Sequence, residues 1–241
     1  MVYRFFFIFL LIVILVSVYQ FSLPSREASK QAFNNSEYIG FESGIRNLQD
    51  GTVEVSSFVR MPEVTPNMFL WWFTDYLQTT QHYKMWHPED HVWMQWENKK
   101  VGEIIGSHHL VHEYIGGDMM KLRIQFISPE EILGYDPNDK NIVVLCAKVG
   151  LLGMNLNIAE MCHVAQKKVW GSELRSIFWL GVVSDQSPET HLGRFIFSWL
   201  ANNFVVRKFT VSKSEGLALQ KHCSEEMIYL AEFLPTLYQQ N

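Results

Sequence analysis

The sequence has few cysteines and no excess of positive charge, and these two shortages exclude several classes of protein. The spacings of Cys146, Cys162 and Cys223 match no zinc-finger or redox motif. We therefore expect all three to be small buried apolar residues, with at least one thiol free. The formal charge of -5 provides no basic surface for nucleic acid, so no nucleic-acid partner is expected.

Charged residues are also few, at 19%, while hydrophobic residues make up 48%. This balance is ordinary for a globular protein and excludes a largely disordered chain. No internal repeat or low-complexity tract is visible in the 241 residues. We expect three parts, with residues 1–23 as a membrane segment, 24–50 as a linker or lead-in, and 51–241 as one folded domain.

One long hydrophobic run lies at the amino end of the chain. Residues 5–18 are apolar except for Ser17, and counting on to Leu23 gives a length close to the roughly 20 residues that a bilayer requires. The positions SVYQFS suit a cleavage site poorly, which favours an uncleaved signal-anchor over a signal peptide. With Arg4 before the run, the sequence predicts a single-pass membrane protein, anchored through residues 5–23, with its domain outside the cytoplasm.

The rest of the chain mixes alternating and helical patterns. A capping box at Ser212–Glu215 begins a long amphipathic helix that runs to the end. A shorter helix is expected over 66–80, and another broken near Asn202. Alternating polarity predicts strands over 52–60, 101–116, 120–127 and 141–150, and two more around the Gly171 turn within 158–183. The expected fold class is therefore α+β, with an antiparallel sheet against a long C-terminal helix.

His222 and Glu226 are four residues apart on the apolar stripe of that last helix. A carboxylate on a buried stripe costs several kcal/mol unless it is paired or bound to a metal ion. A divalent cation would use both groups as ligands. The alternative is a simple His–Glu hydrogen bond at the edge of the core.

Glu113 raises the same question on a strand. It shares a face with Ile105, Val111 and Ile115, which indicates that it points inward. The alternative is a register shifted by one residue, which would place Glu113 in solvent.

The stretch HYKMWHPEDHV adds three histidines, His82, His87 and His91. Pro88 breaks any helix there, so we expect a loop or the entry to a strand. One of these histidines could meet Glu113 and the helical pair, which would give two histidines and two glutamates around zinc. The spacing does not choose among the three.

Several blocks of sequence occur together in one order. They are MFLWWF, then Tyr83, Trp86, Pro88 and His91 as Tyr-x-x-Trp-x-Pro-x-x-His, then HEYIGG with Glu113, then ELRSIFWLG at 173–181, then His222 and Glu226 as His-x-x-x-Glu. In these blocks the chain resembles the 2,4-diacetylphloroglucinol hydrolase family, which includes phloretin hydrolase, over roughly residues 50 to 230.

The resemblance implies a helix-grip fold of the START-like type and a catalytic Zn²⁺. Carried over by motif, the metal ligands are His91, Glu113, His222 and Glu226, so within HYKMWHPEDHV it selects the last histidine. The implied activity is hydrolysis of a carbon–carbon bond between an acyl group and a phenolic or β-diketone carbon in a small acylphenol-like substrate.

The resemblance also assigns residues to the substrate. Tyr83 and His163 are the implied catalytic residues for proton chemistry, and Trp86 and Phe178 are the implied substrate-binding residues. Phe178 stands where a tyrosine hydroxyl is expected in the family, and such a loss costs on the order of 1–3 kcal/mol. The alternative functions are a non-catalytic START-like module that binds apolar aromatic or lipid ligands at the membrane, or hydrolysis of another bond such as an ester.

Overall fold

The computed structural model describes residues 11, 15, 18–32, 42–134, 139, 141–186, 192–204, 206–207 and 211–241. The helical elements are α2 (Arg26–Ala32), α3 (Pro66–Trp71), the π-helix η1 (Trp72–Tyr76), α4 (Thr80–Trp86), α5 (Pro129–Leu133), α6 (Leu192–Ala201) and α8 (Lys213–Gln239). The strands are β1 (Gly44–Asn47), β2 (Val53–Pro62), β3 (His91–Glu97), β4 (His108–Ile115), β5 (Asp118–Ile127), β6 (Ile142–Leu151), β7 (Leu156–Lys168) and β8 (Gly171–Asp185).

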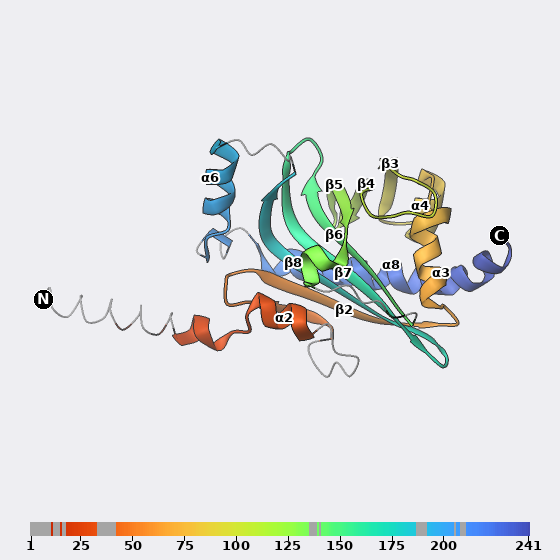
Figure 1. Ribbon diagram of the computed structural model, residues 1–241, viewed down its shortest axis with the longest axis horizontal. Coiled ribbons are helices and arrows are strands. Elements are labelled where there is room, and N and C mark those ends of the chain that lie inside the picture. The colour runs from red at the N-terminus through yellow and green to blue at the C-terminus, as the bar shows by residue number, and fades with distance from the viewer. Residues whose placement is uncertain are drawn as a thin grey trace, which may run out of the picture.

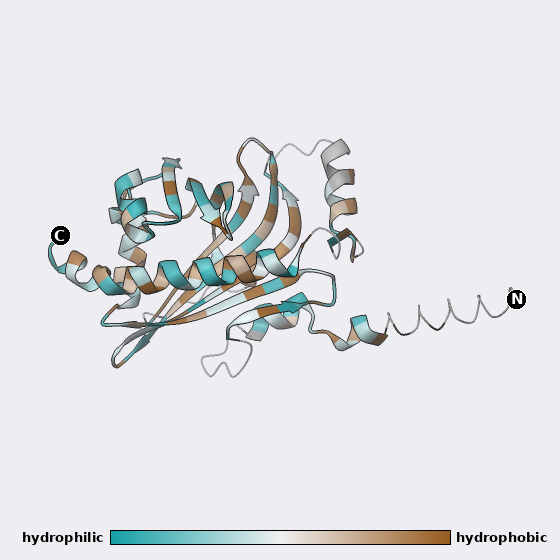
Figure 2. Cartoon of the chain, turned by 180° about the vertical axis from the view of Figure 1, so that it is seen from behind, coloured by the Kyte–Doolittle hydropathy of each residue, from teal (hydrophilic) through white to brown (hydrophobic). Residues whose placement is uncertain are grey.

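The strands form one eight-stranded sheet in the order β1-β2-β8-β7-β6-β5-β4-β3, and the pairs are antiparallel. The sheet curves, and α8 lies along one face of it (Figure 1). Seen from behind, α8 passes in front of the strands, while α2 lies beyond the far side of β2 (Figure 2). This arrangement confirms the predicted α+β class with a curved antiparallel sheet and a long C-terminal helix.

Two apolar cores lie on the two faces of the sheet. On the face toward α8, the helix buries Met227, Leu230 and Leu234 against the inward residues of the strands. The smaller cluster on the other face includes Ile177 and Trp179. Because side chains alternate along a strand, β5, β6, β7 and β8 each supply residues to both cores.

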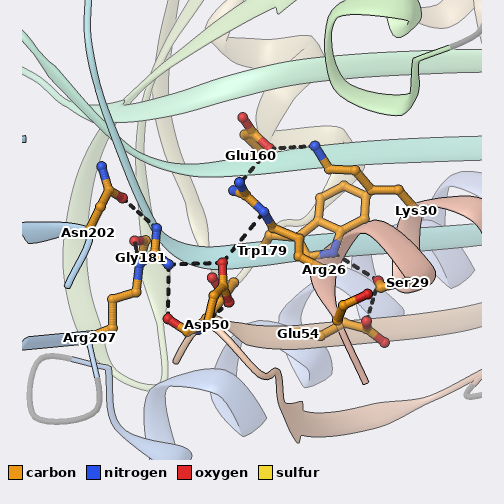
Figure 3. Close-up of polar contacts among 12 residues, drawn as sticks. Arg26, Ser29, Lys30, Asp50, Glu54, Glu160, Trp179, Gly181, Asn202 and Arg207 are labelled. Carbon is orange, nitrogen blue, oxygen red and sulfur yellow. Dashed lines mark hydrogen bonds and ion pairs between the residues drawn. The ribbon is translucent and has the colours of Figure 1, made fainter. Parts of the chain in front are cut away.

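Polar contacts attach α2 to the outer face (Figure 3). The Trp179 indole donates a hydrogen bond of 3.0 Å to Ser29 Oγ, and Ser29 donates to the fully buried Glu54. Lys30 Nζ lies 3.3 Å from a Glu160 carboxylate oxygen. Part of the expected lead-in at 24–50 thus packs on the sheet as α2 and pairs with it as β1.

The cysteines differ from expectation. All three are buried, as predicted, but Cys146 and Cys162 form a disulfide and only Cys223 is free. Cys146 and Cys162 are direct cross-strand partners on β6 and β7, with their Cα atoms 4.1 Å apart. Their spacing in sequence carries no motif because strand register, which the spacing does not reveal, brings them together.

Three expected elements have different bounds. The alternation over 101–116 yields a strand only from His108, and Ile105 lies before it with 59% exposure. The helix expected over 66–80 divides into α3, η1 and α4. The first five residues of HYKMWHPEDHV complete α4, and only the remainder forms the turn and strand entry that Pro88 predicts.

The predicted localisation as a single-pass membrane protein is wrong on the evidence of the structure. Within the described ranges, no helix combines the length and the apolar composition that a membrane crossing requires. Most of the predicted span, residues 1–10, 12–14 and 16–17, lies outside the described residues.

Candidate metal centre

His91 is positioned by the turn that joins α4 to β3. The Thr79 side chain caps α4 by accepting from the His82 amide, and the helix ends before Pro88. His91 then opens β3 at a register irregularity between His91 and Trp93, of the kind that re-aims side chains. Its ring Nδ1 donates to the Tyr83 carbonyl at 2.9 Å. This hydrogen bond leaves the Nε2 atom as the free ligand nitrogen.

Glu113 lies directly opposite His91 in the pairing of β3 with β4. Its side chain points inward, as the sequence pattern predicts, and is 7% exposed. The buried hydroxyl of Tyr83 donates a hydrogen bond to Glu113 Oε2. Burial, followed by the charge of Glu113, raises the pKa of Tyr83 well above its usual value, so the phenol holds its proton.

Helix α8 supplies the other two groups. His222 and Glu226 are one turn apart and both are buried. His222 Nδ1 lies 3.1 Å from Asp90 Oδ2, which leaves its Nε2 free in the same way as that of His91. The Trp86 indole donates to the Glu226 carbonyl at 2.8 Å and thereby ties α4 to α8.

Four potential ligand atoms converge at this point. His91 Nε2 lies 3.5 Å from Glu226 Oε2 and 3.9 Å from Glu113 Oε2, and His222 Nε2 lies 3.9 Å from Glu113 Oε2. Zinc with bonds of about 2.0 to 2.1 Å in a tetrahedral site would separate its ligand atoms by about 3.3 Å. The ligand atoms of His91, His222 and Glu226 all lie within 4.8 Å of one another, so these three would need only a modest contraction around an ion. Glu113 lies outside that group and would have to move closer to bind the same ion.

Two observations favour a cation here over ordinary hydrogen bonding. The Nε2 atoms of His91 and His222 are buried and have no hydrogen-bond partner among the described residues. Burial also raises the pKa of Glu226 to about 8 and lowers that of His91 to about 4. Burial thus keeps His91 in the neutral form that binds a metal, and a bound divalent ion would stabilise the ionised form of Glu226, which burial disfavours.

A second cluster adjoins the first. His87, Asp90 and His222 also have ligand atoms within 4.8 Å of one another. The His87 Nδ1 atom accepts the Asp90 backbone N–H at 3.2 Å, so this histidine supports the Asp90 loop. The Asp90 carboxylate in turn bonds to His222 Nδ1, the ring nitrogen that points away from the proposed ion. A carboxylate in this position on a ligand histidine is typical of metal sites.

The remaining predicted residues lie on the same inner face. The Trp86 ring contacts that of His91, with centroids 5.1 Å apart. His163 on β7 packs edge-to-face against Phe178, with centroids 5.9 Å apart. His163 Nδ1 bonds to Ser176 Oγ, and no direct contact joins its ring to the four converging groups in the described part of the chain. His82, on the outer side of α4, bonds to the Tyr76 carbonyl instead.

Sequence reasoning missed Asp90 and gave no role to His109. The signal for Asp90 was its position next to a candidate ligand, but only the fold shows that it faces His222 on a distant helix. His109 shares the inward face of β4 with Glu113, is 2% exposed, and stacks on Trp96.

Comparison with known proteins identifies the family of this chain. The family model described as the DAPG hydrolase PhiG domain matches residues 23–239. The chain belongs to the DAPG hydrolase family. The match covers all four converging residues and most of the folded chain.

Two curated relatives have related names. A phloretin hydrolase from Eubacterium ramulus is 27% identical over 221 residues, covering 85% of this chain and 73% of the relative. A 2,4-diacetylphloroglucinol hydrolase from Pseudomonas sp is 25% identical over 226 residues, with the same coverage. This chain of the DAPG hydrolase family is therefore a hydrolase.

A solved structure has a distantly similar arrangement. The ginseng major latex-like protein 151 from Panax ginseng is 11% identical, with a TM-score of 0.37, over 71% of this chain and 97% of its own.

Proposed function

We propose that this DAPG hydrolase family member is a zinc-dependent enzyme that hydrolyses the carbon–carbon bond between an acyl group and an activated phenolic or β-diketone carbon. The convergence of His91, Glu113, His222 and Glu226 is the observation that carries the proposal. The names of the curated relatives support an acylphenol-like substrate. The sheet that curves along α8 supports the finer description as a START-like helix-grip fold.

The ligand set suits zinc, since two imidazoles and two carboxylates are among its usual donors. When bound, zinc would supply Lewis-acid chemistry toward an acyl carbonyl and toward water. The protein contributes the orientation. Each ligand histidine is fixed by a hydrogen bond on its Nδ1 atom, His91 to the Tyr83 carbonyl and His222 to Asp90.

The reaction needs a proton at the carbon that leaves. Addition of water to the acyl carbon gives a carboxylic acid, and the phenolic carbon departs with the bonding electron pair and takes up a proton. Tyr83 has a proton on a buried hydroxyl beside Glu113 and is one group proposed to provide it. His163 is the other group proposed for proton chemistry.

Trp86 and Phe178 are proposed to contact the aromatic part of the substrate. Both rings are buried on the side of the sheet that faces α8. Phe178 has no hydroxyl, so it would offer the substrate an apolar surface where the family is expected to offer a hydrogen bond. We therefore propose that the preferred substrate differs from 2,4-diacetylphloroglucinol itself.

Elemental analysis of the purified full chain, combined with assay of carboxylic acid release from a panel of acylphenols, tests the proposal. We expect about one zinc per chain in the parent and loss of both zinc and acid release in His222→Ala and Glu226→Ala. The matched controls are His112→Ala, on the opposite face of β4 from Glu113, and Glu232→Ala, an exposed carboxylate further along α8, and both should keep zinc.

Two results would contradict the proposal. If the parent contains stoichiometric zinc but releases no acid from any acylphenol, the result would favour a hydrolase that acts on another bond. No zinc in the parent, with tight binding of apolar aromatics, would favour the non-catalytic binding module.

A further inference from the structure

The hairpin turn between β4 and β5 comes very close to α8. The turn consists of Gly116 and Gly117, whose φ angles of 64° and 91° suit a two-residue hairpin turn. A β-carbon added to Gly116 would lie 2.7 Å from the β-carbon of Ala218, and it would meet no other described residue within 4 Å, its two chain neighbours apart. A β-carbon on Gly117 would meet none. Only Gly116 is therefore needed for the close approach to the helix as well as for the turn.

This contact lies next to proposed ligands on both elements. Glu113 is three residues before Gly116, on the strand that leads into the turn. His222 is four residues after Ala218, so the two side chains lie one above the other on the same face of α8. The distance between the hairpin and the helix therefore sets the distance between Glu113 and His222.

The opposite side of α8 is in close contact with the other edge of the sheet. Gly216 is two residues before Ala218, which places it about 200° around the helix axis. A β-carbon on the buried Gly216 would lie 3.2 Å from Ile45 Cγ2 on β1 and 3.4 Å from Val55 Cγ2 on β2. Because protein interiors are close-packed, α8 has little room to move away from the hairpin. A larger residue at position 116 would therefore displace the hairpin and not the helix.

The candidate metal centre has little tolerance for such a displacement. Glu113 Oε2 lies 3.9 Å from the Nε2 atoms of both His91 and His222, whereas ligand atoms on tetrahedral zinc are about 3.3 Å apart. Ordinary contact between β-carbons begins at 3.4 Å, so a side chain at Gly116 would push the turn away from α8 by about 0.7 Å. Glu113 would then move in the direction opposite to the one that binding a shared ion requires.

We propose that Gly116 is a positioning residue for the metal centre, because its missing side chain allows the hairpin to approach Ala218 closely enough for Glu113 to share an ion with the ligands of α8. The proposal rests on the proposed function, since it takes these groups as zinc ligands. It also gives a role to the second half of the HEYIGG block. The first half supplies the ligand Glu113, and Gly116 sets the distance of that ligand from the helix.

The zinc affinity of the purified full chain, measured by competition with a chromogenic chelator, tests the proposal. We expect Gly116→Ala to weaken zinc binding by about 10- to 100-fold, the range typical of losing a group that orients a metal ligand. Gly117→Ala is the matched control, because it places the same side chain at the neighbouring positive φ without meeting α8. The control should bind zinc as tightly as the parent.

Two further variants separate the contact from backbone strain in the turn. Adding Ala218→Gly to Gly116→Ala removes the β-carbon that would clash, so this double variant should regain most of the lost zinc affinity. Ala218→Val crowds the same contact from the helix, where the valine side chain is stiff and no positive φ is involved, so it should also weaken zinc binding. Circular dichroism of each metal-free variant establishes that it is folded.

Equal zinc affinities of Gly116→Ala and Gly117→Ala would overturn the proposal. An equal loss of affinity in Gly116→Ala and in the double variant would do so too, because the loss would then come from backbone strain alone. If Gly116→Ala does not fold, Ala218→Val decides, and unchanged zinc binding in that variant overturns the proposal. A parent without zinc would contradict the proposed function and this proposal with it, whereas a zinc-binding parent with these negative results would contradict this proposal alone.

Discussion

The hydroxyl of Tyr83 is buried and donates to one oxygen of Glu113. Since a proposed acid–base role depends on that hydroxyl alone, Tyr83→Phe should lower kcat by about 100-fold or more while zinc stays bound. Steady-state kinetics and zinc content measure the two effects. Tyr114→Phe, an exposed tyrosine next to Glu113, is the control and should behave as the parent. Unchanged kcat in Tyr83→Phe would exclude Tyr83 from the proton chemistry.

Asp90 is a second single residue with a testable role, because it orients the proposed metal ligand His222. Its carboxylate lies 3.1 Å from His222 Nδ1 and holds the ring in the ligating orientation. Loss of such a partner typically costs 10- to 100-fold in metal affinity, so Asp90→Ala should weaken zinc binding by about that factor. Competition with a chromogenic chelator measures the affinity. Glu89→Ala, a neighbouring exposed acid, is the control, and equal affinities in the two variants would contradict the role.

At the scale of elements, α8 carries two of the four proposed ligands and Cys223. Its start is fixed by a capping box in which Ser212 Oγ accepts the Glu215 amide and Glu215 accepts the Ser212 amide. Ser212→Ala should lower the free energy of unfolding by about 1 kcal/mol, as measured by urea denaturation. Ser214→Ala removes only the 3.1 Å contact between the Ser214 and Ser212 hydroxyls and leaves both capping hydrogen bonds in place, so it should cost less. A larger loss in the control would show that the cap is not the stabilising contact.

The capping box was predictable because its signal is local in sequence. The same holds for the strands β2, β5, β6, β7 and β8, whose alternation marks their faces. The division of the 66–86 region into α3, η1 and α4 was not predictable. The π-turn there buries Trp72 and Phe73 in the core, and tertiary packing decides such a local departure from the α-helix.

For the whole molecule, buried neutral histidines make stability depend on pH. Burial lowers the pKa of His109 to about 3, against a usual value of 6.5. The unfolded state therefore binds a proton below pH 6.5 that the folded state does not, so acidification destabilises the fold. We expect His109 to cost about 2 kcal/mol of stability between pH 7.5 and pH 5.

Urea unfolding of the parent and His109→Phe at both pH values tests this expectation. Phenylalanine can retain the stacking on Trp96, whose ring lies 4.4 Å from that of His109, but it does not titrate. The stability of the variant relative to the parent should therefore rise by about that amount at pH 5. A relative stability that is independent of pH would show that the pKa of His109 is the same in the folded and unfolded states.

The sequence by itself determined the class of fold, the start of the last helix, the inward direction of Glu113 and the family. These features depend on periodicity and on motifs, which are properties of neighbouring residues. It also indicated an ion, because carboxylates on apolar faces are costly without one.

Only the tertiary structure decided which groups meet. The β3–β4 register sets His91 opposite Glu113, the Asp90 turn reaches His222 across 132 residues, and the β6–β7 register pairs Cys146 with Cys162. Such contacts depend on strand pairing and on the packing of α8 against the sheet, and neither can be recognised from a local sequence pattern.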